Sequence, residues 1–267
     1  QSRNGQAGYD RFRGRIIFPI HNLAGKVIAF GARILPARHP NSQSMAGGKS
    51  DKDQPKYMNS PETEIYYKGN ILYGIFQAKQ AIRQDELCYL VEGYTDVISL
   101  HQAGIHNVVA SSGTSLTENQ VKLIARFTKN VTILYDGDEA GIKASVRGID
   151  MILEAGLHVK IVVFPEGEDP DSYLNKTGKS DFKAYLVNND KDFITFIPEL
   201  FLKDARNDPI KKAEAIREVV AKISIIPNAI DRGVYLKECS KLLDIDEKTL
   251  TFEFNKIRIK KKAQQET

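Results

Sequence analysis

The sequence of 267 residues contains no tryptophan and only two cysteines, Cys88 and Cys239, which lie far apart and belong to no CxxC motif. It therefore encodes neither a disulfide framework nor a cysteine-based zinc site, and a reducing, cytoplasmic setting is expected. No stretch approaches the roughly 18 apolar residues of a membrane-spanning helix. The first residues lack the apolar segment of a signal peptide, so we expect neither export nor contact with a membrane. The first residue is not Met, so we expect this sequence to be a piece of a longer chain.

Charge is distributed unevenly along a sequence whose overall composition is that of an ordinary globular protein. Residues 1–68 contain 11 Lys and Arg against 5 Asp and Glu, a net charge of +6, whereas residues 69–188 contain 11 against 15, a net charge of −4. Residues 189–267 carry +2, which completes the total of +4. A basic region suits phosphate groups and an acidic region suits cations, although segments of this length also differ in charge by chance.

Three segments differ in their predicted secondary structure. In residues 1–68, apolar runs at 15–20 and 26–33 flank a turn-prone sequence and predict a β-hairpin, which is followed by a polar loop at 36–54. Residues 69–188 alternate helical and buried-strand patterns, which indicates an α/β domain with a mostly parallel sheet covered by helices. Residues 189–267 predict a small helical subdomain.

The periodicity of the α/β segment predicts helices at 72–84, 95–103, 117–128 and 139–155, and strands at 87–92, 107–110, 131–135 and 158–164. In the last segment it predicts helices at 193–202, 213–226, 234–243 and 250–259. Ligand sites in mostly parallel sheets form beyond the carboxyl ends of the strands, so the residues that follow each strand are the first candidates for a functional site.

Acidic residues follow three of the predicted strands. Glu92 ends the first strand, Asp136 and Asp138 follow the third, and Asp169 and Asp171 follow the fourth. In extended chain, residues two apart point the same way, so we expect each Asp pair to reach one ion. The carboxyl ends of parallel strands meet at one edge of the sheet, which predicts that the five carboxylates converge there.

Asp96 lies four residues after Glu92. If a helix has begun by then, Asp96 would lie on the same face as the end of the strand, near Glu92. Carboxylates this close would repel one another unless cations neutralise them. Because the sequence offers no cysteine site and no paired histidines, the ions expected are Mg²⁺ or Mn²⁺. The alternative is that each acid only caps a helix or stabilises a turn, which would be favoured for any one acid alone but not for the whole set.

The motif Glu92-Gly93 with Asp136-Gly137-Asp138, on alternating strands and helices, resembles the TOPRIM domain of primases, topoisomerases and some nucleases. Longer matching words resemble the bacterial replicative (DnaG-type) DNA primases from about residue 10 to residue 190. These words are RFRGRIIFPI at 11–20, PKYMNSPET at 55–63, LYG at 72–74, EGYTDV at 92–97, YDGD at 135–138 and GEDPD at 167–171.

This resemblance implies three domains: a partial N-terminal basic α+β subdomain of a polymerase core at 1–68, a TOPRIM-like catalytic domain at 69–188 and a C-terminal helical subdomain at 189–267. The zinc-binding domain, the first part of the core and the helicase-binding domain of the family would be absent. The resemblance therefore does not imply that this fragment is active by itself.

The activity implied is that of a nucleotidyltransferase, a DNA-directed RNA polymerase that makes short RNA primers on single-stranded DNA during DNA replication. Two or more Mg²⁺ or Mn²⁺ ions would be the cofactors, and zinc would belong to the absent domain. The implied partners are the single-stranded DNA template, ribonucleoside triphosphates, the RNA primer–DNA hybrid and, through the absent domain, the replicative helicase in the primosome. The core would be monomeric and would work in the cytoplasm at replication forks in the nucleoid.

The resemblance also implies roles for individual residues. Glu92, Asp136 and Asp138 would be catalytic and would bind metal together with Asp169 and Asp171, while Asp96 would support them. Arg33, Lys56 and Lys68 are the residues implied to contact phosphates of the template or nucleotide. Tyr57, beside Lys56, is a candidate to stack on a base, and Asn59 is a further candidate for nucleic-acid or nucleotide binding. The basic residues would otherwise serve only solubility, and a tyrosine in this position is as often part of the core.

Two other functions remain open from the sequence. One is a TOPRIM nuclease or topoisomerase that cleaves phosphodiesters, although none of the 11 tyrosines is identifiable as the nucleophile that a topoisomerase needs. The other is a non-catalytic, metal-dependent module that binds nucleic acid. The sequence at 111–114, SSGT, either offers backbone amides to a phosphate or forms a simple turn, and the turn is slightly favoured.

Overall fold

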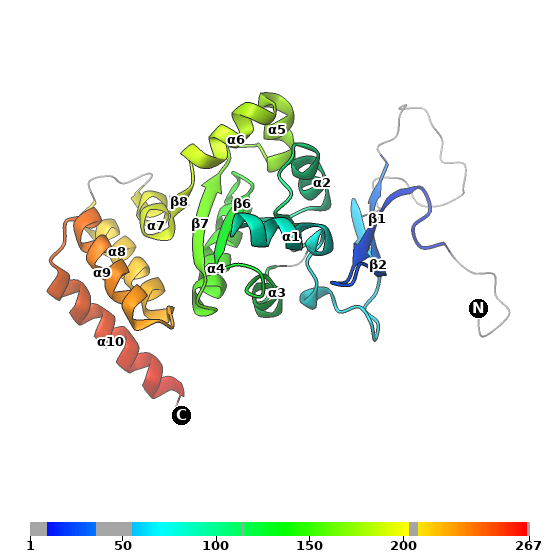
Figure 1. Ribbon diagram of the computed structural model, residues 1–267. Helices are drawn as coiled ribbons and strands as arrows, with labels where there is room; N and C mark the ends of the chain where they lie inside the picture. Colours follow the sequence, from blue (N-terminus) through cyan, green and yellow to red (C-terminus); the bar gives the residue numbers. More distant parts are fainter. Residues whose placement is uncertain (1–9, 36–54, 114, 203–207, 266–267) are drawn as a thin grey trace. The chain divides into compact units, whose positions relative to one another are not determined.

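The computed structural model describes residues 10–35, 55–113, 115–202 and 208–265 (Figure 1). The polar loop predicted at 36–54 lies outside the described residues. The chain divides into two compact units, residues 1–68 and residues 69–267. Within the described residues, no helix is both long and apolar enough to cross a membrane.

The described part of the first unit is built on an antiparallel sheet of three strands in the order β1-β2-β3. The predicted hairpin is confirmed as β1 (Arg15–His21) paired with β2 (Val27–Ile34), with Arg15 opposite Ile34. β3 (Tyr57–Asn59) pairs along the other side of β2 and was not predicted, because three residues are too few to show an alternating pattern. A short 3-10 helix, η2 (Lys68–Asn70), spans the boundary between the units.

The second unit contains a five-stranded sheet in the order β5-β4-β6-β7-β8. Its strands are β4 (Cys88–Val91), β5 (Val108–Ala110), β6 (Asn130–Tyr135), β7 (His158–Val163) and β8 (Lys191–Asp192). The first four are parallel and β8 runs antiparallel to β7, which confirms the prediction of a mostly parallel sheet. The chain leaves β4 toward β5 but leaves β6 toward β7, so a topological switch point lies between the carboxyl ends of β4 and β6.

The helices of the α/β part are α1 (Ile75–Asp85), α2 (Tyr94–Gln102), α3 (Glu118–Ile124), α4 (Glu139–Glu154), α5 (Pro170–Thr177) and α6 (Lys179–Asn188). The four predicted helices correspond to α1, α2, α3 and α4. Helix α1 begins three residues later than predicted, because Gly74 adopts a left-handed conformation just before it. Helix α5 was not predicted, and α6 falls at the end of this segment, where only Phe182 and Leu186 turn inward as buried residues.

The sheet is buried on both faces. Side chains of β4, β6 and β7 join those of α2, α5 and α6 in one apolar cluster, which includes Val91, Leu134, Val162, Leu100 and Phe182. On the other face α4 packs against β6 and β7 (Figure 1). This packing holds the loops after β4, β6 and β7 at one edge of the sheet, where the predicted acidic residues lie.

The predicted helical segment is confirmed as α7 (Phe193–Leu202), α8 (Pro209–Ile225), α9 (Ala229–Leu243) and α10 (Glu247–Gln265). Helix α8 packs against α7, α9, α10 and also α4. Lys222 of α8 is buried, with 2% of its side chain exposed, and it forms ion pairs with Asp150 of α4 at 2.7 Å and with Glu218 at 3.2 Å. The helical segment is therefore joined to the α/β part by a buried charge as well as by apolar contacts.

Candidate active site

Glu92 follows β4 directly, at the switch point of the sheet. Its carboxyl group is half-buried, and the buried Oε1 atom has no hydrogen-bond partner within the described structure. Burial raises the pKa of Glu92, and the nearby carboxylates of Asp136 and Asp138 raise it further. A cation bound among these carboxylates would oppose this rise, because it would offset the repulsion between them.

The loop after β6 carries Asp136 and Asp138 around a turn that only glycine fits. A Cβ atom on Gly137 would lie 2.3 Å from the backbone oxygen of Phe164 and 2.7 Å from that of Pro165. Asp138 is the N-cap of α4, and its Oδ1 accepts a hydrogen bond of 2.7 Å from the amide of Gly141. The turn is thus held against the chain that follows β7, which carries Asp169.

Asp169 is the N-cap of α5, and its Oδ1 accepts a hydrogen bond of 2.6 Å from the amide of Ser172. The extended backbone expected between Asp169 and Asp171 is not found. Pro170 begins α5, so the chain is helical rather than extended at Asp171. The Oδ1 of Asp171 instead accepts hydrogen bonds from Ser99 of α2 at 2.5 Å and from Asn175 at 2.9 Å, and so ties α2 to α5.

Asp96 lies in the first turn of α2, with 6% of its surface exposed, and its Oδ2 accepts a hydrogen bond of 3.0 Å from the amide of Gly93. Burial, followed by repulsion from Asp169, raises the pKa of Asp96 to about 7, although the hydrogen bond from Gly93 opposes the rise. Burial, then Asp169 and Asp138, raises the pKa of Asp136 to about 6. These shifts show that the carboxylates lie close enough to interact.

We name the six carboxylates at this edge of the sheet the acidic cluster: Glu92, Asp96, Asp136, Asp138, Asp169 and Asp171. Within the described residues, no three Asp, Glu, His or Cys side chains are already arranged to hold one metal ion. The chemistry of the cluster nevertheless fits a divalent cation. Asp138 and Asp169 cap their helices through Oδ1, and Oε1 of Glu92 is buried without a partner in the same described part of the chain. Hard oxygen donors that repel one another are the ligands that Mg²⁺ and Mn²⁺ prefer.

The predicted basic and aromatic residues lie on the sheet of the first unit. Arg33 on β2 is directly opposite Tyr57 on β3, and its guanidinium lies 5.4 Å from the centre of the tyrosine ring. The ammonium of Lys56 lies 5.9 Å from the same ring. Tyr57 is 36% exposed on the edge strand, so it does not belong to the core. Asn59 pairs with Gly31 of β2 two residues further along β3.

Lys68 lies at the end of the first unit. Burial lowers the pKa of Lys68, and the nearby carboxylate of Glu62 opposes this effect. Its backbone amide donates a hydrogen bond of 3.3 Å to Oε1 of the same glutamate. Lys68 is therefore already near one carboxylate of its own unit.

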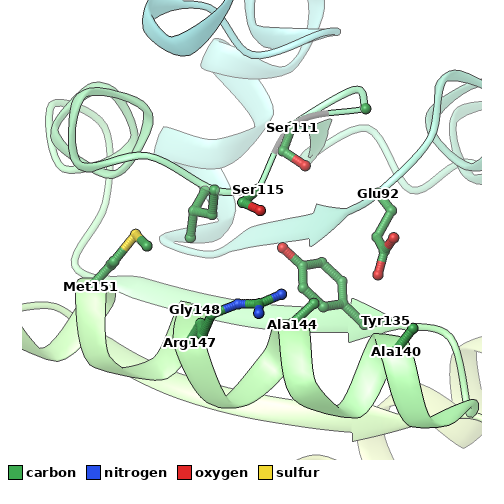
Figure 2. Close-up of a pocket in the computed structure, with 11 residues that line it drawn as sticks. Glu92, Ser111, Ser115, Tyr135, Ala140, Ala144, Arg147, Gly148 and Met151 are labelled. Carbon is green, nitrogen blue, oxygen red and sulfur yellow. The ribbon is translucent and has the colours of Figure 1, made fainter.

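A pocket of about 310 Å³ opens beside Glu92 on the α4 face of the sheet (Figure 2). Its polar lining includes Arg147, which sequence reasoning missed because it lies in mid-helix, outside every matching word. The hydroxyl of Tyr135 faces the pocket and is hydrogen-bonded to Ser111. The amides of Ser111 and Ser112 bond to the carbonyls of Val91 and Glu92, so these two amides join β4 rather than being offered to a phosphate, while Thr114 lies outside the described residues.

Three family models match successive parts of the chain. The model described as "DNA primase catalytic core, N-terminal domain" matches residues 1–79, the model "Toprim-like" matches residues 89–174, and the model "DnaB-helicase binding domain of primase" matches residues 205–248. The DNA primase of Clostridium acetobutylicum is 41% identical over 249 residues, which cover 92% of this chain and 38% of that protein.

Solved structures agree with these matches. The crystal structure of a DNA primase domain from Pseudomonas aeruginosa is 30% identical, with a TM-score of 0.77, and the match covers 96% of this chain and 76% of that one. This chain belongs to the DNA primase family. The structure of a DnaG primase catalytic domain bound to single-stranded DNA is 35% identical, with a TM-score of 0.74, over 90% of this chain and 73% of that one.

Two consequences follow for the primase family assignment. The chain spans only 38% of the length of the curated relative from Clostridium acetobutylicum. The expectation that the chain lacks the family's helicase-binding domain is wrong, because a model with that description matches residues 205–248. These residues cover α8 and α9, whose apolar spacing predicts helices but carries no distinctive motif.

Proposed function

We propose that this chain is the larger part of the polymerase core of a DNA primase, a nucleotidyltransferase that makes short RNA primers on single-stranded DNA. The observation that carries the proposal is the acidic cluster at the switch point of a TOPRIM-like sheet. Such a cluster has no need of a protein nucleophile, because the divalent ions that it would hold can position a phosphoryl group and neutralise its charge instead. The similar proteins are DNA primases, which supports this reaction over cleavage.

In the proposed reaction, the 3′-oxygen of one nucleotide forms a bond to the α-phosphorus of the incoming ribonucleoside triphosphate. The bond from that phosphorus to the bridging oxygen breaks, and pyrophosphate leaves. Divalent metal ions, when bound, supply positive charge at the attacking and leaving oxygens. Asp136, Asp138 and Asp169 would hold Mg²⁺ or Mn²⁺ by carboxylate oxygens, and Glu92 would either join them or take the proton of the attacking hydroxyl.

The remaining acids would hold the metal-binding carboxylates in place rather than contact the substrate. Asp96 would hold the start of α2 in place through its bond with Gly93, and so fix the chain that carries Glu92. Asp171 would assist by holding α5 against α2, which fixes Asp169 at the N-terminus of α5. Both are positioning residues in this proposal, since their hydrogen bonds are made within the protein.

The test of the catalytic proposal is Asp138→Asn in the full-length enzyme. Asn caps helices as well as Asp does, so α4 should still form while metal affinity falls. We expect dinucleotide synthesis from single-stranded DNA, ribonucleotides and Mg²⁺ to drop to background. Asp181→Asn, which removes one exposed carboxylate from the first turn of α6, should leave synthesis unchanged.

The same assay separates the alternative functions. A TOPRIM nuclease would give cut DNA, and a non-catalytic module would give neither cut DNA nor RNA. Full RNA synthesis by Asp138→Asn would refute the assignment of this residue.

We also propose that Arg33, Lys56 and Lys68 contact phosphates of the template or nucleotide, that Tyr57 stacks on a base, and that Asn59 belongs to the same nucleic-acid-binding surface. This is supported by the exposed cationic surface around Tyr57 and by the similar DnaG catalytic domain, whose structure was solved with single-stranded DNA bound. In a salt titration of single-stranded DNA binding, Lys56→Ala should weaken binding and reduce the slope of log affinity against log salt by about 1. Lys26→Ala, at the exposed hairpin turn, is the control. Equal affinity and slope in both variants would favour a role in solubility alone.

The replicative helicase is the protein partner we propose, through residues 205–248, because the helicase-binding model matches there. The primase would then act at replication forks in the cytoplasm, as a monomeric core within the primosome. Pull-down of the purified helicase by the full-length enzyme, with and without α8 and α9 replaced by unrelated helices, tests this proposal.

A further inference from the structure

The pocket beside Glu92 is open because small residues form one of its walls. Ala140, Ala144 and Gly148 are spaced by four residues along α4, so they lie on one face of the helix, and all three line the pocket. These small residues leave the space beside the helix unfilled. The opposite wall comes from Ser111 and Ser115, which follow β5 (Figure 2), and Gly113 also lines the pocket.

Among the described residues, Arg147 is the only cationic side chain that lines the pocket. Its guanidinium extends along α4 toward the hydroxyl of Tyr135, with Glu92 beyond the tyrosine ring (Figure 2). Within the described part of the chain Arg147 forms no ion pair, although the acidic cluster lies at the same edge of the sheet. A guanidinium directed into a pocket without a carboxylate partner is suited to bind an anionic oxygen of a ligand.

The lining changes character from one end of the pocket to the other. Glu92 provides a carboxylate at one end, while Leu116 and Met151 provide apolar surface, and Met151 marks the other end in Figure 2. Arg147 and Ser115 supply donors between them. A ligand that matches this lining carries a hydroxyl group, an anionic group such as a phosphate, and an apolar group.

We propose that the pocket holds the nucleotide that supplies the attacking 3′-hydroxyl, and that Arg147 binds the phosphate of this nucleotide. This inference rests on the proposed polymerase function. The 3′-hydroxyl would lie near Glu92, and the base would lie against Leu116 and Met151. The same pocket would take the first ribonucleotide at initiation and the 3′-terminal nucleotide of the primer afterwards, since both supply the same group to the same bond.

The enzyme must keep two nucleotide positions apart, one for the incoming triphosphate and one for the nucleotide that supplies the 3′-hydroxyl. The triphosphate of the incoming nucleotide needs the metal ions and cations outside this pocket, whereas the nucleotide in the pocket carries a single phosphodiester during extension. One arginine is enough to recognise one phosphodiester, and a further cluster of cations is not required. Arg147 is therefore a binding residue for the nucleophile strand.

The first test is primer extension by the full-length enzyme on a primed single-stranded template. We expect Arg147→Met to raise the KM for the primer by about tenfold or more, and to change the KM for the incoming ribonucleotide less than about twofold. Arg147→Lys, which keeps the charge but not the fork geometry, should recover part of the loss. Lys122→Met removes an exposed cation of α3 outside the pocket and should change neither value. Equal changes in both KM values, or no change in either, would overturn the proposal.

The second test is direct binding, which stays informative even if the polymerase proposal fails. A fluorescent, 5′-phosphorylated ribo-oligonucleotide is titrated with each variant in Mg²⁺ and without nucleotides. We expect Arg147→Met to weaken binding about tenfold relative to the wild type and to Lys122→Met. Ala144→Met, which fills the pocket from the small-residue face of the same helix, should weaken it as well. Equal binding by the wild type and Arg147→Met would contradict the assignment of the pocket. If the wild-type enzyme bound the oligonucleotide but made no RNA, only the proposed polymerase function would be contradicted.

Discussion

Gly137 shows how one residue sets the position of the acidic cluster. Its backbone approaches the carbonyl oxygens of Phe164 and Pro165 so closely that a Cβ atom would overlap both. The loop after β6 and the loop after β7 are thereby held together, and each carries acids of the cluster. The identity of this residue follows from the packing of two backbones and not from a preference of the turn itself.

We predict that Gly137→Ala lowers the free energy of unfolding by about 2 kcal/mol or more, because backbone atoms must move to accept the methyl group. Urea unfolding followed by circular dichroism measures the change. The control is Gly233→Ala in α9, where a Cβ atom meets nothing within 4 Å. That substitution should raise stability by about 0.5–1 kcal/mol, since alanine favours the helix. Equal effects of the two substitutions would contradict the close approach at Gly137.

The residues of the acidic cluster could be named from the sequence because each follows a strand or begins a helix. Their orientations could not all be predicted, as Asp171 demonstrates: the proline before it starts a helix and turns its carboxylate toward Ser99. Arg147 could not be found at all. It enters the pocket only because α4 packs beside the loop after β5, and this contact between distant parts of the chain leaves no local motif.

At the scale of the elements, Lys222 is the main polar link between α8 and α4. An ammonium with 2% of its side chain exposed must be paired, because an unpaired buried charge is costly. Asp150 accepts a hydrogen bond of 2.7 Å from its ammonium, and Glu218, on the same helix as the lysine, forms an ion pair with it at 3.2 Å. The docking of the helical segment therefore depends on a carboxylate that belongs to the α/β part.

We predict that Asp150→Ala destabilises the chain by about 1–3 kcal/mol, because only Glu218 then remains to neutralise Lys222. Lys222→Met should be nearly neutral or stabilising, and in that background Asp150→Ala should cost little. Thermal unfolding of the two single variants and the double variant measures this coupling. As a control, Lys241→Met breaks an exposed pair with Glu238 and should change stability by less than about 0.5 kcal/mol. A loss in Asp150→Ala no larger than in this control would argue against a stabilising role of the buried pair.

Elements with a long, repeated apolar pattern were predicted well, and short ones were not. The strands β4, β6 and β7 lie near their predicted positions because burial on both faces dictates their composition. The helices α2 and α4 also lie near their predicted positions, because their apolar residues recur with the helical period. The strands β3 and β8 have three and two residues, so they depend on pairing with a neighbour and carry no period of their own. Helix α5 begins at Pro170, inside a segment whose acidic motif had been interpreted as extended chain.

At the scale of the whole molecule, the uneven charge has an energetic consequence. Without metal, the second unit holds several carboxylates that resist ionisation, because burial and mutual repulsion raise the pKa of Asp96 to about 7, that of Asp136 to about 6, and that of Glu92 in the same direction. The folded state therefore retains protons at a pH where the unfolded chain, with ordinary aspartate pKa values near 3.8, has released them. Linkage then requires that the free energy of unfolding falls as the pH rises from the unfolded pKa near 3.8 through the folded values of about 6 and about 7. The free energy of unfolding is lowest above the folded pKa values.

We predict that Mg²⁺ removes most of this penalty. At pH 8 the cluster is ionised, so millimolar Mg²⁺ should raise the melting temperature by at least about 3 °C over NaCl of equal ionic strength. At pH 5 protons already occupy Asp96 and Asp136, and the increase should be much smaller. Asp136→Asn removes one carboxylate without removing its volume, so this variant should lose both the response to Mg²⁺ and part of the destabilisation between pH 5 and pH 8. If Mg²⁺ raised the melting temperature equally at both pH values, or equally in Asp136→Asn, the ions would be stabilising the chain somewhere other than at the acidic cluster.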